Sequence, residues 1–104
     1  MAKYLLAYHG GGMPETDEER NRVLQQWEKW FHSLGSAVVD AGNPVSRTNT
    51  VGNGGSVSGA GTNPVSGYSI LEADSLEKAT ELAKGCPVLD GGATIEVCET
   101  FNAM

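Results

Sequence analysis

The order of strand-like and helix-like segments constrains the fold of this chain more than any other feature of its sequence. A strand pattern leads into a long amphipathic helix and a Val-rich strand, and the same order returns after a Gly/Ser/Asn-rich stretch. The expected segments are residues 3–9, 17–34, 36–41, 65–73, 75–84 and 94–99. This β-α-β-β-α-β order is typical of a ferredoxin-like α+β sandwich with an antiparallel sheet and both helices on one face. We therefore expect residues 1–104 to form a single domain.

The first strand is largely apolar on both of its faces. Two sets of residues alternate along it, namely Tyr4, Leu6 and Tyr8, and Leu5, Ala7 and His9. Successive side chains of a strand point to opposite faces, so both faces need cover. The helices of a ferredoxin-like sandwich cover only one of them. The other face is predicted to form a two-fold symmetric homodimer interface, the commonest symmetry among oligomers.

Both helices have recognisable start signals. Thr16 and Glu19 fit a capping box, and Ser75 follows Asp74 at the start of the second helix. The apolar stripe of the first helix consists of Val23, Trp27, Trp30, Phe31 and Leu34. Its spacing predicts one face packed on the sheet, with Trp27 at the centre of the core. The predicted buried face of the second helix consists of Leu76, Ala79, Leu82 and Ala83.

The middle of the chain changes composition. From residue 44 to residue 64 it is rich in Ser, Thr, Asn and Gly, and Asn53-Gly54 is a turn signal between Val51 and Val57. Thr48, Thr50 and Val51 have the character of an edge strand. We interpret the stretch as an irregular hairpin extension with mobile tips.

Charge and residue usage exclude several classes of function. The net charge is −6 and the isoelectric point is near 4.7, which argues against nucleic acid and anionic membrane surfaces as partners. No apolar run approaches the roughly 20 residues of a membrane span, and no signal peptide pattern is present, so we expect a cytoplasmic protein. The two cysteines and two histidines match no metal-ligand spacing, and the glycine run at 10–12 lacks phosphate-loop spacing. No metal and no cofactor are expected.

Four stretches together resemble the YCII-related domain family, including its DGPF-type members. They are KYLLAYHG, WEKWFHSLG running into VVDAGNPV, GYSILEADSLEKATELAKGCP, and GGATIEV, and they cover roughly two thirds of the chain in the family's order. The resemblance implies a ferredoxin-like subunit that dimerises sheet to sheet as an α+β barrel. Many members of that family have no established activity, and a few related proteins are enzymes that act on small aromatic or lactone-like substrates.

The sequence departs from the family at its suspected catalytic pair. Relatives with activity have a His on the first long helix and an Asp in the loop after the second helix. These positions fall on Trp27 and near Cys86 in this chain, and GTNPVSG stands in the region of the DGPF motif. The family pair therefore does not transfer to this sequence.

The best acid–base candidates that the chain offers are His9 and Asp90. His9 ends the first strand, where it is either a general base or a His hydrogen-bonded to a backbone carbonyl. Asp90 precedes Gly91-Gly92, where it either faces a pocket and orients a His or stabilises a turn. The end of the first strand and the start of the last lie at the same end of such a sheet. We predict that His9 and Asp90 line one cleft there.

The ligand pocket is expected to include Tyr8 and Trp30, in the interior beside that cleft. Two functions from different classes remain open, and a purely structural accessory subunit is a third. One is a dimeric module that binds a small organic molecule or a partner protein. The alternative is an isomerase or lyase that acts on a small aromatic or lactone-like substrate through the His9/Asp90 pair. Whether the protein is an enzyme stays open at this stage.

Overall fold

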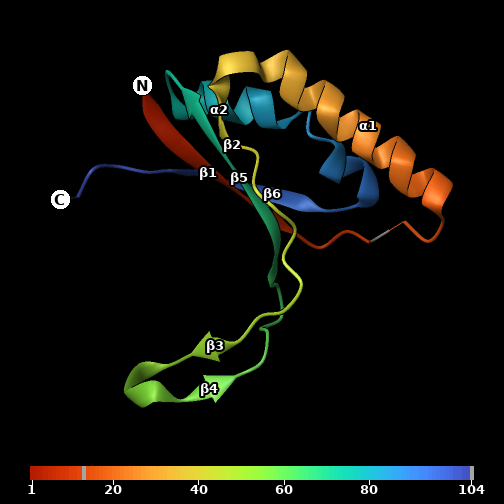
Figure 1. Ribbon diagram of the computed structural model, residues 1–104. Coiled ribbons are helices and arrows are strands. Elements are labelled where there is room, and N and C mark those ends of the chain that lie inside the picture. The colour runs from red at the N-terminus through yellow and green to blue at the C-terminus, as the bar shows by residue number, and fades with distance from the viewer. Residues whose placement is uncertain (13, 104) are drawn as a thin grey trace.

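The computed structural model describes residues 1–12 and 14–103 and contains a four-stranded antiparallel sheet with two α-helices. The sheet has the order β2 (Val38–Asp40), β5 (Val65–Ala73), β1 (Ala2–His9) and β6 (Thr94–Glu99). Helices α1 (Asp17–Leu34) and α2 (Leu76–Ala83) lie on one face of the sheet, as expected from the sequence (Figure 1). This arrangement is compatible with a ferredoxin-like α+β fold.

The helix ends follow the predicted capping signals. The Oγ1 atom of Thr16 accepts a hydrogen bond of 3.1 Å from the Glu19 N–H, and the hydroxyl of Ser75 does the same for Lys78 in α2. Helix α1 ends at Gly35, where the 3₁₀ turn η1 (Gly35–Ala37) begins. This turn uses residues that were expected to start the next strand, so β2 is shorter than predicted.

The core lies between the sheet and the helices. Its buried side chains come from β1, β5, α1, α2 and the turn after α2, namely Leu6, Tyr8, Trp30, Leu71, Ala83 and Cys86. Trp27 packs edge-on against Tyr8 and Trp30, with ring centroids 5.6 Å and 5.8 Å apart. Trp27 is only half-buried, whereas Trp30 is buried. Trp27 also contacts Phe31 and is therefore central to the aromatic cluster, as its place on the stripe predicted, whereas Trp30 is the more deeply buried of the two.

Leu76 was predicted to be buried, and this prediction is wrong. Its side chain is exposed, while Ala79 and Ala83 are buried. Leu76 is the first residue of α2, and the buried stripe of this short helix consists of residues four positions apart. The contact with the sheet thus begins one turn after the helix does.

The opposite face of the sheet carries no helix (Figure 1). Cross-strand pairs place Leu5 between Ile70 and Cys98, and Ala7 between Tyr68 and Glu96. We call this surface the helix-free face and define it by Leu5, Ala7, His9, Tyr68, Ile70, Glu96 and Cys98. Its middle is apolar, as the alternation along the first strand predicted.

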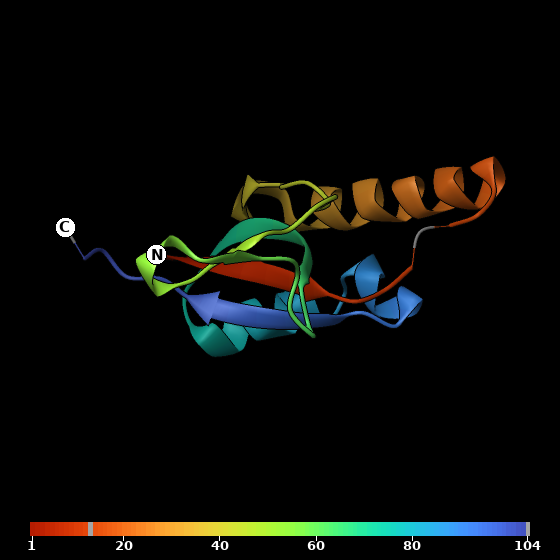
Figure 2. The ribbon, with the colours of Figure 1, turned by 90° about the horizontal axis from the view of Figure 1, so that it is seen from below.

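The middle of the chain forms a separate two-stranded ribbon. Strands β3 (Thr50–Val51) and β4 (Val57–Ser58) pair with each other through the 3₁₀ turn η2 (Asn53–Gly55). Residues 46–64, called the arm below, project on the side of the sheet opposite the helices (Figures 1 and 2). The predicted hairpin is confirmed, but β3 does not join the main sheet as an edge strand.

Neither helix of the described residues combines the length and the apolar character that crossing a membrane requires.

Candidate functional site

His9 is a buried side chain at the end of β1, only 7% exposed. The pairing of β1 with β5 is irregular between Tyr8 and His9, which turns the chain at this point. Its Nδ1 atom lies 3.0 Å from the carbonyl oxygen of Asn63 and 3.2 Å from that of Pro64. A ring nitrogen that faces carbonyl oxygens acts as a donor. The interpretation of His9 as a strand-end His bonded to backbone carbonyls is therefore confirmed.

The second ring nitrogen of His9 meets a carboxylate. Nε2 lies 2.5 Å from Oε1 of Glu96, but the contact lacks the alignment of a hydrogen bond. Glu96 is exposed on β6, so its carboxylate remains in water while the imidazole is shielded. The carbonyls at Nδ1 and the carboxylate at Nε2 therefore occupy both nitrogens and fix the orientation of the ring.

Asp90 lies elsewhere on the molecule. It belongs to the 3₁₀ turn η3 (Pro87–Gly91), between α2 and β6. It lines a shallow depression with a cavity volume of about 480 Å³, whose other lining residues are Gln26, Lys29, Trp30, Ser33, Gly85 and Pro87. These residues belong to α1 and the connection after α2, so the depression is on the helix side of the sheet.

The structure brings together the segments that carry His9 and Asp90, but not the two side chains. His9 pairs with Thr94, so the end of β1 and the start of β6 are neighbours as expected. The side chain of His9 contacts Glu96, Asn63 and Pro64. Within residues 1–12 and 14–103, no hydrogen bond or ion pair joins His9 to Asp90. The catalytic role proposed for each residue stays a prediction.

Tyr8 and Trp30, the predicted ligand-pocket residues, both lie in the core. The hydroxyl of Tyr8 donates to Ser69 Oγ at 2.7 Å, and Ser69 in turn donates to the carbonyl of Ala41 at 2.7 Å. Burial raises the pKa of the Tyr8 hydroxyl. The indole N–H of Trp30 donates to the Leu82 carbonyl at 3.3 Å. Trp30 reaches the wall of the depression beside Asp90, whereas Tyr8 does not line it.

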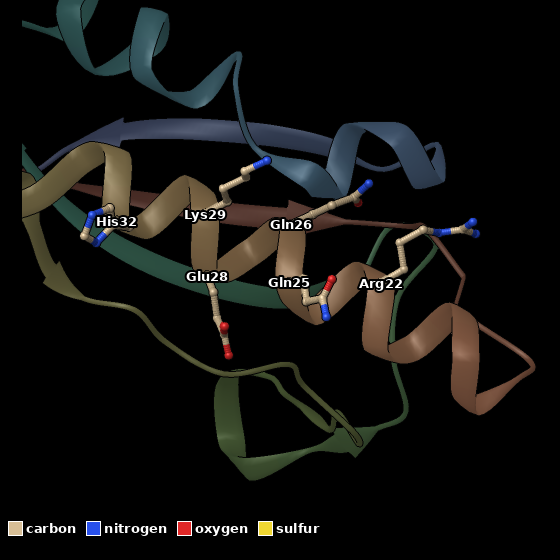
Figure 3. A pocket seen from close by; sticks show the side chains of 6 residues that line it. All are labelled: Arg22, Gln25, Gln26, Glu28, Lys29 and His32. Atoms are coloured by element: carbon tan, nitrogen blue, oxygen red, sulfur yellow. The ribbon is translucent and has the colours of Figure 1, made fainter.

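A second depression of about 490 Å³ lies on the outer side of α1. Its lining residues are Arg22, Gln25, Gln26, Glu28, Lys29 and His32. Figure 3 shows that all six side chains project from this one helix, with Gln26 and Lys29 pointing toward η3. No second element supplies a wall, so the surface is a row of hydrated polar groups rather than an enclosed site.

Two further groups were considered as reactive centres. Cys86 is buried, and burial raises the pKa of its thiol, which disfavours the thiolate that a nucleophile requires. Among the described residues, no cluster of three or more His, Cys, Asp or Glu side chains could hold a metal ion.

Glu96 is the residue that sequence reasoning missed at this site. It lies at an alternating position of an ordinary strand, and its proximity to His9 follows from the register of β6 against β1.

A comparison with protein-family models and a comparison with curated proteins each found no match to this chain. The resemblance to the YCII-related family therefore rests on the sequence stretches alone.

Proposed function

We propose that this protein is a homodimer of the YCII-related type that binds a small organic molecule. In this proposal two ferredoxin-like subunits pack through their helix-free faces as an α+β barrel, and the ligand lies beside His9. The observation that supports it is an apolar sheet face that ends in a shielded His–carboxylate contact.

The dimer part of the proposal rests on the apolar middle of the helix-free face. Leu5 and Ile70 are neighbours across β1 and β5, and Cys98 adjoins Leu5 on β6. All three are only partly buried within one subunit. Two sheets pack face to face about 10 Å apart with their side chains interdigitated, which would remove this apolar surface from water.

The ligand part of the proposal rests on the mixture of groups at one end of that face. Sites for small molecules are mostly apolar, with a few polar groups that fix the orientation of the ligand. Ala7 and Tyr68 supply an apolar and aromatic floor, while His9 and Glu96 supply the polar edge. A small aromatic or lactone-like molecule with one polar substituent matches this combination. The proposal involves no cofactor and no metal.

A second candidate function is catalysis, and the His9–Glu96 contact is the observation that favours it. An isomerase or lyase of this type would move a proton at a carbon beside a polar substituent. Both ring nitrogens of His9 are occupied, Nδ1 by two carbonyls and Nε2 by Glu96, so the exposed carboxylate of Glu96 would take and return the proton while His9 orients it. In this candidate Glu96 replaces Asp90 as the carboxylate of the pair, and His9 is the orienting group. The proposed location is the cytoplasm, where the unpaired Cys86 and Cys98 would stay reduced.

The dimer is tested by sedimentation velocity together with thiol alkylation over a range of protein concentrations. Cys98 is on the helix-free face, so its alkylation should slow as the concentration rises and the face is covered. Cys86 is buried within one subunit and serves as the internal reference, since its alkylation should be slow throughout. A chain that sediments as a monomer at micromolar concentration contradicts the dimer.

The ligand is tested by a thermal-shift screen of small aromatic acids and lactones, because a compound that binds only the folded state raises the melting temperature. A hit is then measured with the His9→Asn variant and with Leu24→Ser, a change on the exposed surface of α1. Loss of binding in the first variant alone supports the site. Equal binding by both variants moves the site away from His9.

A further inference from the structure

Among the residues that the structure describes, the two strands of the arm pair only with each other. Val51 and Val57 face each other across β3 and β4, and their side chains are 70% and 65% exposed. Every residue from 47 to 64 is exposed. An isolated two-stranded hairpin is at best marginally stable in water. The exposed valine pair, Val51 and Val57, therefore lacks the cover that would stabilise it.

The position of the arm relates it to the helix-free face. It projects on that side of the sheet, and in the view from below it lies over the sheet (Figures 1 and 2). Its base is attached to the main sheet by the hydrogen bond from Val45 N–H to the Ser66 carbonyl, 2.9 Å long. A second copy seated on the helix-free face would therefore lie beside the arm of the first.

His9 connects the arm to the same face. Its Nδ1 atom faces the carbonyl oxygens of Asn63 and Pro64. These are the last two residues of the arm. The ring thus fixes the direction in which the arm leaves the sheet. This contact gives His9 a structural role that does not depend on any ligand.

The charge of the arm suits a second copy of this chain as its occupant. Residues 46–64 contain one charged side chain, Arg47, in a chain with a net charge of −6. The strands of the helix-free face carry the carboxylates of Glu72, opposite Lys3, and Glu96. An arm whose single charge is a cation can approach such an acidic subunit without the repulsion that two acidic surfaces experience.

We propose that the arm is a dimerisation arm, whose valine pair packs on the second copy bound at the helix-free face. His9 is then a positioning residue for the base of the arm. This inference rests on the proposed dimer, and it adds that each subunit holds the other with residues outside the main sheet.

The test is the dimer dissociation constant of the full chain, measured by sedimentation for the double variant Val51→Ser/Val57→Ser. Both side chains are exposed in the single subunit, so the fold of the monomer should survive, which circular dichroism checks. The matched control is Leu24→Ser, an apolar side chain on α1 that is 60% exposed. The double variant should raise the dissociation constant at least about tenfold, because burying apolar area drives association. The control should leave it unchanged.

The outcomes separate the arm from the dimer. A wild-type chain that stays monomeric overturns both proposals. If the wild-type chain is a dimer and the double variant has the same dissociation constant, the proposed role of the arm is overturned while the dimer stands. Hydrogen exchange provides the second measurement, since the amides of residues 50–58 should exchange more slowly in the wild-type dimer than in the diluted monomer. Equal exchange rates of these amides in the dimer and the monomer also overturn the proposed role of the arm.

Discussion

The imidazole of His9 and the carboxylate of Glu96 meet diagonally across β1 and β6, with 2.5 Å between Nε2 and Oε1. The direct cross-strand partners are Thr94 for His9 and Ala7 for Glu96. Because the other ring nitrogen faces the carbonyls of Asn63 and Pro64, the imidazole is held from both sides. The ring therefore links the last strand of the sheet to the base of the arm.

The first prediction separates the two contacts of this ring. His9→Ala should lower the free energy of unfolding by about 1–3 kcal/mol, because it removes a buried side chain and the donor to the two carbonyls. Glu96→Gln should lower it by less than about 1 kcal/mol, since an exposed carboxylate is screened by water. Urea denaturation of both variants measures the difference. A larger loss for Glu96→Gln would mean that the carboxylate contact dominates.

The sequence predicted most of the elements, because their signals are local. The cap at Thr16 and the apolar stripe from Val23 to Leu34 define α1 without any knowledge of its neighbours. The alternation in β1 predicted a sheet with apolar groups on both faces, and the core and the helix-free face have these groups. The Gly and Asn residues between Val51 and Val57 predicted the turn.

The sequence did not predict the pairing details, because these depend on register and on crossing angles. The contact between His9 and Glu96 follows from the alignment of β1 with β6, which no local pattern encodes. The deeper burial of Trp30 than of Trp27 follows from how α1 lies on the sheet, since both residues belong to the same stripe. His9 and Asp90 were placed together from topology alone, and topology gives the end of a strand but not the direction of a side chain.

The second prediction concerns the two tryptophans of α1. Trp30→Ala should cost about 3–5 kcal/mol, the usual loss for a buried aromatic side chain. Trp27→Ala should cost less, about 2–3 kcal/mol, because part of its side chain remains in water in the fold. Chemical denaturation of the two variants under the same conditions gives the ranking. A greater loss for Trp27→Ala would restore the order expected from the sequence.

The third prediction uses two glycines with positive φ. Gly42 has φ of 78°, and a Cβ atom built there would lie 1.7 Å from the Tyr68 carbonyl oxygen. Gly92 has φ of 85°, and no atom lies within 4 Å of its built Cβ position. Gly92→Ala should therefore cost about 1–2 kcal/mol, the price of the left-handed conformation alone. Gly42→Ala should cost at least about 3 kcal/mol, because the backbone of β5 must also shift. Similar thermal stabilities for the two variants would contradict the close approach at Gly42.

The fourth prediction is a loss of stability at alkaline pH. Burial raises the pKa of Cys86 above its ordinary value of 9.0, and burial likewise raises that of Tyr8 above 10.0. The unfolded chain releases these protons first, so above about pH 9 it binds fewer protons than the fold does. The contribution of each group is complete below its unfolded pKa and disappears as the pH rises through the folded pKa.

Two variants assign this alkaline loss to its sources. Cys86→Ala should make the free energy of unfolding fall less steeply between pH 9.0 and 10.0, because the buried thiol that resists ionisation is gone. Tyr8→Phe should keep the decline in that interval and reduce it above pH 10.0, where the phenol begins to titrate in the unfolded chain. Urea denaturation at closely spaced pH values measures both slopes. A wild-type stability that rises between pH 9.0 and 10.0 would show that the fold favours the thiolate of Cys86, opposite to the effect of burial, and would reopen Cys86 as a nucleophile.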